Sequence, residues 1–182
     1  MTAVDGRVER GARNREAIVD ALLACYEAGV LRPSIPEVAE RAGVSTRSVH
    51  NHFADVEALR AEVAHRQAER YAHLMTAVAS LDALLDARAA FFEAVTPVRR
   101  AALLTVDRSP TIAANLARLD HVLRRQITAL FPGLDVGMLE AIDALTSWDT
   151  WNRLRTAQGL SVAHARAVLE RTIRTLTEGS AP

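Results

Sequence analysis

The sequence contains no lysine, so all 22 of its basic residues are arginines, and 22 aspartates and glutamates balance them. Any attraction to a polyanion therefore has to come from the local distribution of charge. The only cysteine, Cys25, excludes an intramolecular disulfide, and its surroundings (DALLACYEAG) predict that it packs in the core. Aromatic residues make up only 4% of the chain, whereas apolar residues make up 49%, which favours helices around a real core.

No apolar run approaches the roughly 20 residues that a membrane-spanning helix needs. The first residues, MTAVDGRVERG, lack the apolar region of a signal peptide, so we expect a cytoplasmic protein with no membrane partner. The sequence also lacks a glycine-rich phosphate loop, a GxSxG motif, an HExxH motif and a cysteine pair. His65 and His73, with Glu69 between them, would lie about 12 Å apart along a helix, too far to share one metal. We therefore expect no enzyme, no catalytic residue, no metal and no cofactor.

Apolar residues recur at helical spacing, and no stretch alternates with period two, which predicts an all-α fold of about nine helices. Caps, glycines and prolines divide the chain into helices predicted over residues 13–28, 35–42, 46–53, 56–79, 81–96, 97–106, 111–130, 136–158 and 162–178. This division makes three predictions about helix length and continuity. The fourth helix is long, Pro97 interrupts the next stretch, and the segment from 136 to 158 is continuous.

The stretch Ser34–Phe53 (SIPEVAERAGVSTRSVHNHF) has the pattern of two short helices joined by a tight turn. Ser34 and Glu37 form a capping box for the first helix, and Ser45 caps the second. Gly43 stands where the chain has to leave the first helix through a left-handed conformation. The inward positions are small or apolar: Val38, Ala39, Val44, Val49 and Phe53. This pattern predicts a helix-turn-helix, whose second helix is the one presented to the DNA major groove.

The outward face of this second helix is polar and has no acidic residue. Its Arg47 carries the fork that matches guanine O6 and N7, while the other side chains suit phosphate oxygens and base edges. The predicted DNA-binding residues are Ser34, Ser45, Thr46, Arg47, Ser48, His50, Asn51 and His52. The remaining interpretation of this surface is a solvated helix of an ordinary helical protein.

Residues 1–53 are neutral overall, with seven arginines and seven acids. The charges are nevertheless grouped: residues 41–54 contain two arginines, two histidines and no acid. Four further arginines (Arg7, Arg10, Arg13 and Arg15) precede or open the first predicted helix. Residues 1–12 show no periodicity and are expected to form a mobile arm, which either follows the DNA backbone or keeps this end soluble.

The segment Ala42–Phe53 resembles the AGVSxxTLYxHF signature of the TetR family of transcriptional regulators. The resemblance extends from about residue 13 to about residue 60. Three positions depart from the family pattern. His50 replaces a frequent tyrosine and Val56 a frequent lysine, so part of the usual phosphate clamp is missing, whereas Arg47 replaces a frequent glycine and adds a base-reading side chain.

The resemblance implies a homodimer formed through the last two helices, a palindromic operator in double-stranded DNA, and a small-molecule effector bound in a C-terminal helical bundle. On this basis residues 13–54 form the DNA-binding domain, and residues 55–182 form the ligand-binding and dimerisation domain. The candidate ligand-binding residues are Tyr71, Met75, Phe91, Phe92, Trp148, Trp151 and Asn152. Core packing or a dimer interface explains the same aromatic residues.

Together these features predict a sequence-specific DNA-binding transcriptional regulator, in the form of a ligand-responsive repressor. The alternative is a helical interaction module that is derived from the same fold but does not bind DNA. The neutral charge of the N-terminal part and the absence of lysine keep this alternative open.

Overall fold

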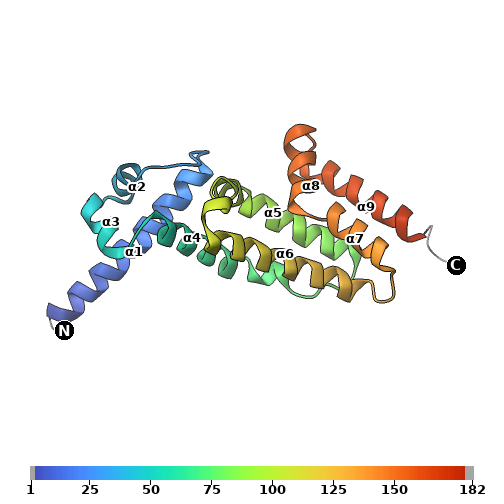
Figure 1. Cartoon of the computed structure of the whole chain (residues 1–182), viewed down its shortest axis with the longest axis horizontal. Helices are drawn as coiled ribbons and strands as arrows, with labels where there is room; N and C mark the ends of the chain where they lie inside the picture. Colours follow the sequence, from blue (N-terminus) through green and yellow to red (C-terminus); the bar gives the residue numbers. More distant parts are fainter. Residues whose placement is uncertain (1–2, 179–182) are drawn as a thin grey trace. The chain divides into compact units, whose positions relative to one another are not determined.

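The computed structural model of the chain describes the backbone of residues 3–178 and the side chains of residues 8–178. Over this range the chain is helical, and it contains no strand, as predicted (Figure 1). The helices are α1 (Ala3–Glu27), α2 (Ile35–Ala42), α3 (Thr46–His52), α4 (Val56–Arg70), α5 (Leu81–Leu103), α6 (Pro110–Leu130), α7 (Val136–Leu145), α8 (Trp148–Asn152) and α9 (Val162–Glu178). Short 3-10 turns cover Ala72–Met75 and Val106–Arg108, and a π-helical turn covers Arg153–Ala157. No helix in this part of the chain is long and apolar enough to cross a membrane.

The helices form two compact units. Unit 1 comprises Met1–Glu69 and Pro97–Ala114, and unit 2 comprises Arg70–Thr96 and Asn115–Pro182. The helices α5 and α6 therefore each contribute to both units, and α5 passes from unit 2 to unit 1 at Pro97.

Unit 1 is held together by an apolar core to which every one of its first four helices contributes. Buried side chains come from α1 (Ile18, Val19, Leu22), α2 (Val38, Ala39), α3 (Val49), the residue after it (Phe53), α4 (Leu59, Val63) and α5 (Val98, Ala101). Figure 1 shows α2 and α3 lying against α1 in this unit. At 25 cal/mol per Å², each fully buried aliphatic side chain contributes about 1.5–3 kcal/mol.

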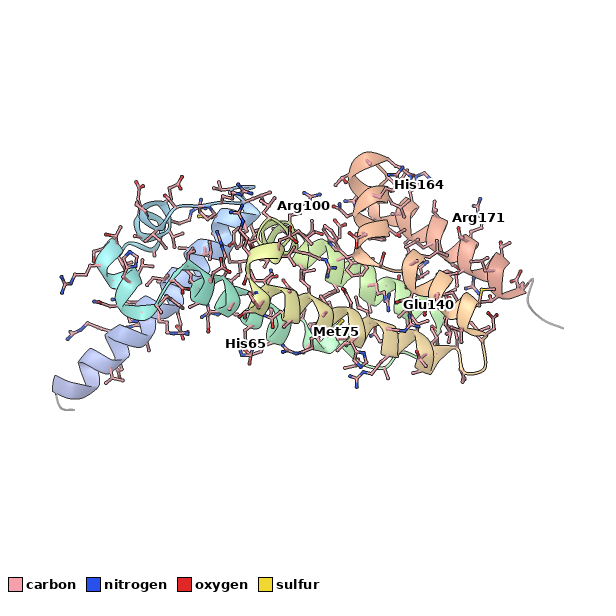
Figure 2. The ribbon with its side chains drawn as sticks, in the orientation of Figure 1. His65, Met75, Arg100, Glu140, His164 and Arg171 are labelled. Atoms are coloured by element: carbon pink, nitrogen blue, oxygen red, sulfur yellow. The ribbon has the colours of Figure 1, made fainter. Side chains whose placement is uncertain are left out.

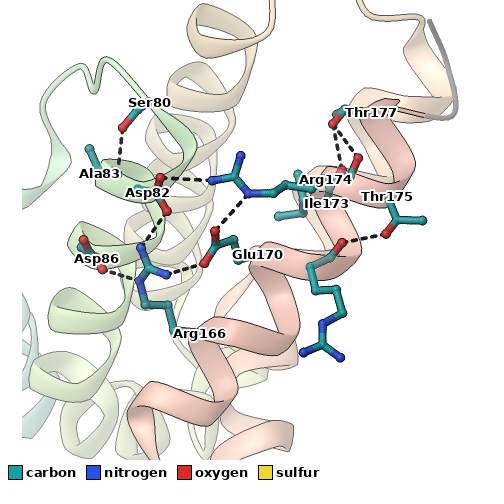
Figure 3. A network of polar contacts seen from close by, with 11 residues as sticks. Ser80, Asp82, Ala83, Asp86, Arg166, Glu170, Ile173, Arg174, Thr175 and Thr177 are labelled. Carbon is teal, nitrogen blue, oxygen red and sulfur yellow. Dashed lines mark hydrogen bonds and ion pairs between the residues drawn. The ribbon is translucent and has the colours of Figure 1, made fainter.

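Unit 2 has a separate core that is rich in aromatic residues, with Phe91 and Phe92 from α5 and Trp148 and Trp151 from α8. A group of charged residues at its surface joins α9 to α5 (Figure 3). The guanidinium of Arg166 contacts Asp82, at 3.0 Å, and Asp86, both on α5, as well as Glu170 on its own helix. Arg174 bridges the same Asp82 and Glu170. These shared ion pairs hold α9 in one position along α5.

Two features of the predicted N-terminal half are wrong. The first helix begins at Ala3, so the segment expected to form a mobile arm is helical from there on. Alanine, arginine and glutamate are good helix formers, and no proline interrupts this segment, so it forms a helix despite Gly6 and Gly11. The long helix predicted over residues 56–79 ends at Arg70. Its apolar stripe serves two cores, because Leu59 and Val63 pack in unit 1 whereas Tyr71, Leu74, Met75 and Val78 pack in unit 2.

Two predicted breaks in the C-terminal half also differ from the structure. Pro97 lies inside α5 and does not interrupt it, because Val95, Val98 and Ala101 are buried on either side and outweigh the lost backbone bond. The helix predicted over residues 136–158 is divided at Thr146–Ser147, where Ser147 accepts a hydrogen bond from the Thr150 amide and begins α8. Asp135 and Ser161 cap the starts of α7 and α9, where they accept hydrogen bonds from the amides of Met138 and His164.

The left-handed conformation of Gly43, which ends α2, predicts that substitutions at this residue destabilise the fold. Gly43 has φ +66°, and nothing lies within 4 Å of the position that a Cβ would occupy, so a substitution there costs conformational energy alone. We expect Gly43→Ala to lower the free energy of unfolding by about 1 kcal/mol. Gly43→Asn should lower it by less, because asparagine tolerates the left-handed region. Urea unfolding followed by circular dichroism measures both, and equal stability of wild type and Gly43→Ala would contradict this account.

Candidate nucleic-acid interface

The helix-turn-helix has the predicted geometry at each of its ends. Ser34 and Glu37 form the complete capping box, with the Ser34 amide donating to Glu37 Oε2 at 2.7 Å. These bonds from Ser34 lower the pKa of the Glu37 carboxyl. Gly43 donates its amide to the end of α2, and Ser45 Oγ accepts from the Ser48 amide at 3.1 Å to begin α3. The turn between the two helices is thus fixed by backbone and side-chain bonds at both ends.

The inner face of α3 is anchored by Val49, which is 1% exposed, and by Phe53, whose amide closes the helix on Val49 O. The opposite face is open to solvent. It carries the exposed side chains of Thr46, Arg47, His50 and Asn51. No acidic residue lies in α3.

Four of the predicted DNA-binding residues have other positions. Ser34 and Ser45 are exposed, but their hydroxyls already serve as helix caps. Ser48 and His52 are half-buried at the edge of α3. The structure therefore brings Thr46, Arg47, His50 and Asn51 together on the open face of α3, with Ser48 and His52 at its edge, whereas Ser34 lies at the start of α2.

An arginine of α1 contacts the aromatic residue that ends α3. Arg15 lies on α1, and its guanidinium sits 4.9 Å from the centre of the Phe53 ring. The same guanidinium donates two hydrogen bonds of 2.9 Å to the carboxylate of Glu62 on α4. One side chain thus joins α1, α4 and the end of α3. The sequence offered no signal for this pairing, because 47 residues separate the partners.

A second contact between α1 and α3 lies one turn earlier in α1, at Gly11. A Cβ added at Gly11 would lie 4.0 Å from His52 Cε1, so α1 passes beside the last turn of α3. Arg10 and Arg13 flank this glycine and are exposed. Arg7 lies among the residues whose side chains are outside the described part of the chain.

The candidate ligand-binding residues all lie in unit 2. Phe91, Phe92, Trp148 and Trp151 are buried, whereas Tyr71, Met75 and Asn152 are half-buried. Figure 2 shows Met75 on the turn that follows α4. The rings form a packed series, with centroid separations of 6.5 Å (Tyr71–Phe91), 5.8 Å (Phe91–Phe92) and 6.4 Å (Phe92–Trp151). The indole nitrogens are bonded as well: Trp148 Nε1 donates to Thr96 Oγ1 and Trp151 Nε1 to Glu93 Oε1. These aromatic residues contribute directly to the core.

The histidines considered for metal binding lie on the surface. His65 is exposed on α4 (Figure 2), and its Nε2 lies 3.3 Å from Glu69 Oε1. Within the described residues, no group of three or more histidine, cysteine, aspartate or glutamate side chains is arranged to hold a metal ion.

Comparisons with known proteins identify the class of fold to which the structure belongs. No protein-family model matches the sequence, and no curated protein sequence matches it. Solved structures do match over nearly the whole chain. A TetR-family transcriptional regulator from Mesorhizobium loti superposes with a TM-score of 0.66 at 18% identity, over 92% of this chain and 96% of its own. A transcriptional regulator from Rhodococcus sp. RHA1 gives a TM-score of 0.68 at 19% identity, over 94% and 99%.

A third similar structure is the multidrug binding protein EbrR in complex with imidazole, with a TM-score of 0.62 at 20% identity over 86% of this chain and 93% of its own. The shared architecture is that of helical transcriptional regulators with an N-terminal helix-turn-helix. More specifically, the chain has the fold of the TetR-family regulators.

The pair formed by Arg15 and Glu62 makes stability depend on pH. Hydrogen bonds from Arg15 lower the pKa of the Glu62 carboxyl below its ordinary value of 4.5. The pair therefore stabilises the fold above about pH 4.5, and this contribution is lost as the pH falls through the lowered pKa. Because the Arg15 side chain is 42% exposed, solvent screening limits the gain to about 0.5 kcal/mol.

We expect Glu62→Gln to be less stable than wild type by this amount at pH 7, and the difference to shrink towards pH 3. Urea unfolding at a series of pH values measures it. Glu16→Gln, at an exposed position of α1, is the matched control and should follow the wild-type curve. A difference that stays constant down to pH 3 would contradict the assignment.

Proposed function

We propose that the chain is a sequence-specific, DNA-binding transcriptional regulator that acts as a homodimer on a palindromic operator. The observation that carries this proposal is the open face of α3. It presents Thr46, Arg47, His50 and Asn51 without an acid, on a short helix fixed by two caps and a left-handed glycine. The TetR-like fold supports the same conclusion.

Within this surface the side chains have different roles. Arg47 is the base-reading residue, because a guanidinium can donate two parallel hydrogen bonds to guanine O6 and N7. Thr46, His50 and Asn51 contact phosphates or neighbouring base edges and set the register. Ser48 and His52 lie at the edge of this face. Ser34 and Ser45 cap the amino ends of α2 and α3, where the helix dipole favours a phosphate. Arg10 and Arg13 on α1 add positive charge beside α3.

The proposed dimer forms through the last helices, as in the family that the sequence resembles. A two-fold axis would place two copies of α3 about 34 Å apart, one turn of DNA. The operator is then a palindrome with one half-site per protomer.

Regulation requires a ligand that binds the two states of the protein with different affinity. We propose a small molecule bound in unit 2 that relieves repression. EbrR, which has a similar fold, is a multidrug binding protein and supports a ligand of this kind. The helix α5 links the two events physically, because residues of one continuous helix belong to both units.

The alternative function is an interaction module that does not bind DNA. The salt dependence of the affinity for duplex DNA distinguishes it from the proposed regulator. Binding through phosphates releases counterions, so affinity for duplex DNA falls steeply with salt concentration. A protein that has lost DNA binding shows no measurable affinity even at low salt.

The direct test is selection of random duplex DNA by the purified protein, with Arg47→Ala in parallel. We expect wild type to enrich a palindrome and Arg47→Ala to relax one base pair in each half-site, at a cost of about 1–3 kcal/mol per contact. Arg32→Ala is the matched control: it removes the same charge from an exposed position between α1 and α2 and should leave the selected sequence unchanged. Failure to enrich any sequence at low salt would refute the proposal, and an identical palindrome for Arg47→Ala would refute the role of Arg47.

A further inference from the structure

Unit 2 contains a buried arginine that the proposed function does not use. Arg88 lies on α5, and only 3% of its surface is exposed. Its Nη1 donates to the carbonyl oxygen and the hydroxyl of Thr146, at 2.6 and 2.7 Å, and its Nη2 donates to the carbonyl oxygen of Leu123 at 2.6 Å. The guanidinium is therefore held rigidly between α5, α6 and the end of α7.

All of these acceptors are neutral, so the buried charge has no direct counter-ion. Among the described residues, no carboxylate forms an ion pair with Arg88. Asp143 acts on it only through its charge, and the Asp143 carboxylate accepts a hydrogen bond from Arg124 at 3.1 Å. Burial accordingly lowers the pKa of Arg88 to about 10. A buried cation of this kind costs several kcal/mol unless an anion compensates it.

The fork of Arg88 is also only partly used. A guanidinium has five N–H groups, and three hydrogen bonds occupy two of its nitrogens, which leaves two N–H groups, one of them on Nε. The Nε atom is buried and has no hydrogen-bond partner. Nε and Nη2 lie on the same edge of the guanidinium and together match the two oxygens of a carboxylate.

A second unsatisfied atom lies on a neighbouring turn. Gln126 is buried on the same face of α6 as Leu123, and its Oε1 has no hydrogen-bond partner, whereas its Nε2 donates to Thr76 O at 2.7 Å. Along α5, one turn after Arg88, come Phe91 and Phe92 of the aromatic series. One helix thus carries an unsatisfied donor within a turn of aromatic rings, a combination of polar and apolar groups that suits an amphipathic ligand.

We propose that Arg88 is the anchor of a binding site for an organic carboxylate whose apolar part lies against the aromatic core of unit 2. That this carboxylate is the effector rests on the regulator function proposed above. Its oxygens accept from Nε and from the remaining N–H of Nη2, and Gln126 Oε1 accepts from a donor group of the ligand. A bound carboxylate supplies the counter-ion that the surrounding residues do not provide.

A purely structural role accounts for Arg88 less well. The three existing bonds join neutral groups, which an uncharged donor could serve without burying a charge. The carbonyl of Thr146 does lie at the end of α7, where a cation is favourable, but this interaction leaves Nε unused. A bound carboxylate accounts for both the buried charge of Arg88 and its unpaired Nε.

The test measures binding of carboxylates to the full chain in the absence of DNA. The probes are straight-chain carboxylates from butanoate to dodecanoate and 3-phenylpropanoate, each beside its primary amide. The only two tryptophans, Trp148 and Trp151, both lie in the core of unit 2, so their fluorescence reports binding. We expect at least one carboxylate to bind wild type about tenfold or more tightly than its amide, because charge-assisted bonds are the stronger ones.

Arg88→Met should lower the affinity for that carboxylate about 10- to 100-fold, and Arg88→Lys, which keeps the charge without the fork, should give an intermediate value. Arg171→Met, at an exposed position of α9, is the matched control and should bind as wild type does. If Arg88→Met does not fold, the comparison of carboxylate with amide on wild type still decides. Three results would overturn the proposal: no carboxylate binds wild type, amides bind equally well, or folded Arg88→Met keeps wild-type affinity. Because DNA is absent, these results are independent of whether the chain binds an operator.

Discussion

The whole interface depends on burying one side of a helix that is too short to exist alone. The helix α3 has seven residues, whereas isolated helices below about 12 residues are marginal in water. Its position is therefore set from outside, by Val49 and Phe53 in the core of unit 1 and by the caps at its ends. Arg15 completes this support, because it stacks on Phe53 while Glu62 holds it from α4. The open face of α3 can be polar and variable because the opposite face fixes the helix.

The two units use their charged side chains differently. In unit 1 the ion pair of Arg15 is satisfied within the protein and contributes to the position of α3. In unit 2 the guanidinium of Arg88 has strong bonds to three neutral acceptors and one unused edge. A group of the first kind stabilises one structure, whereas a group of the second kind leaves free energy that an added ligand can release. Arg15 therefore uses its donors within the protein, whereas Arg88 keeps a donor without a partner.

Local signals in the sequence predicted the helix-turn-helix closely, because a capping box, a glycine and a serine cap act over three or four residues. Ser34, Gly43 and Ser45 have the expected geometry. The extent of α4 and the continuity of α5 through Pro97 were predicted wrongly, since they are decided by which core each apolar residue joins. The pairing of Arg15 with Glu62 and the setting of Arg88 involve partners 35 to 58 residues away. Such contacts have no local signature, so the structure was needed to find them.

The proline inside α5 has a mechanical consequence. Residue 97 lacks the amide hydrogen that would bond one turn back, so the helix has its lowest bending stiffness at this residue. The same residue marks the change from unit 2 to unit 1. The position in α5 that lacks a backbone hydrogen bond therefore coincides with the border between the two units.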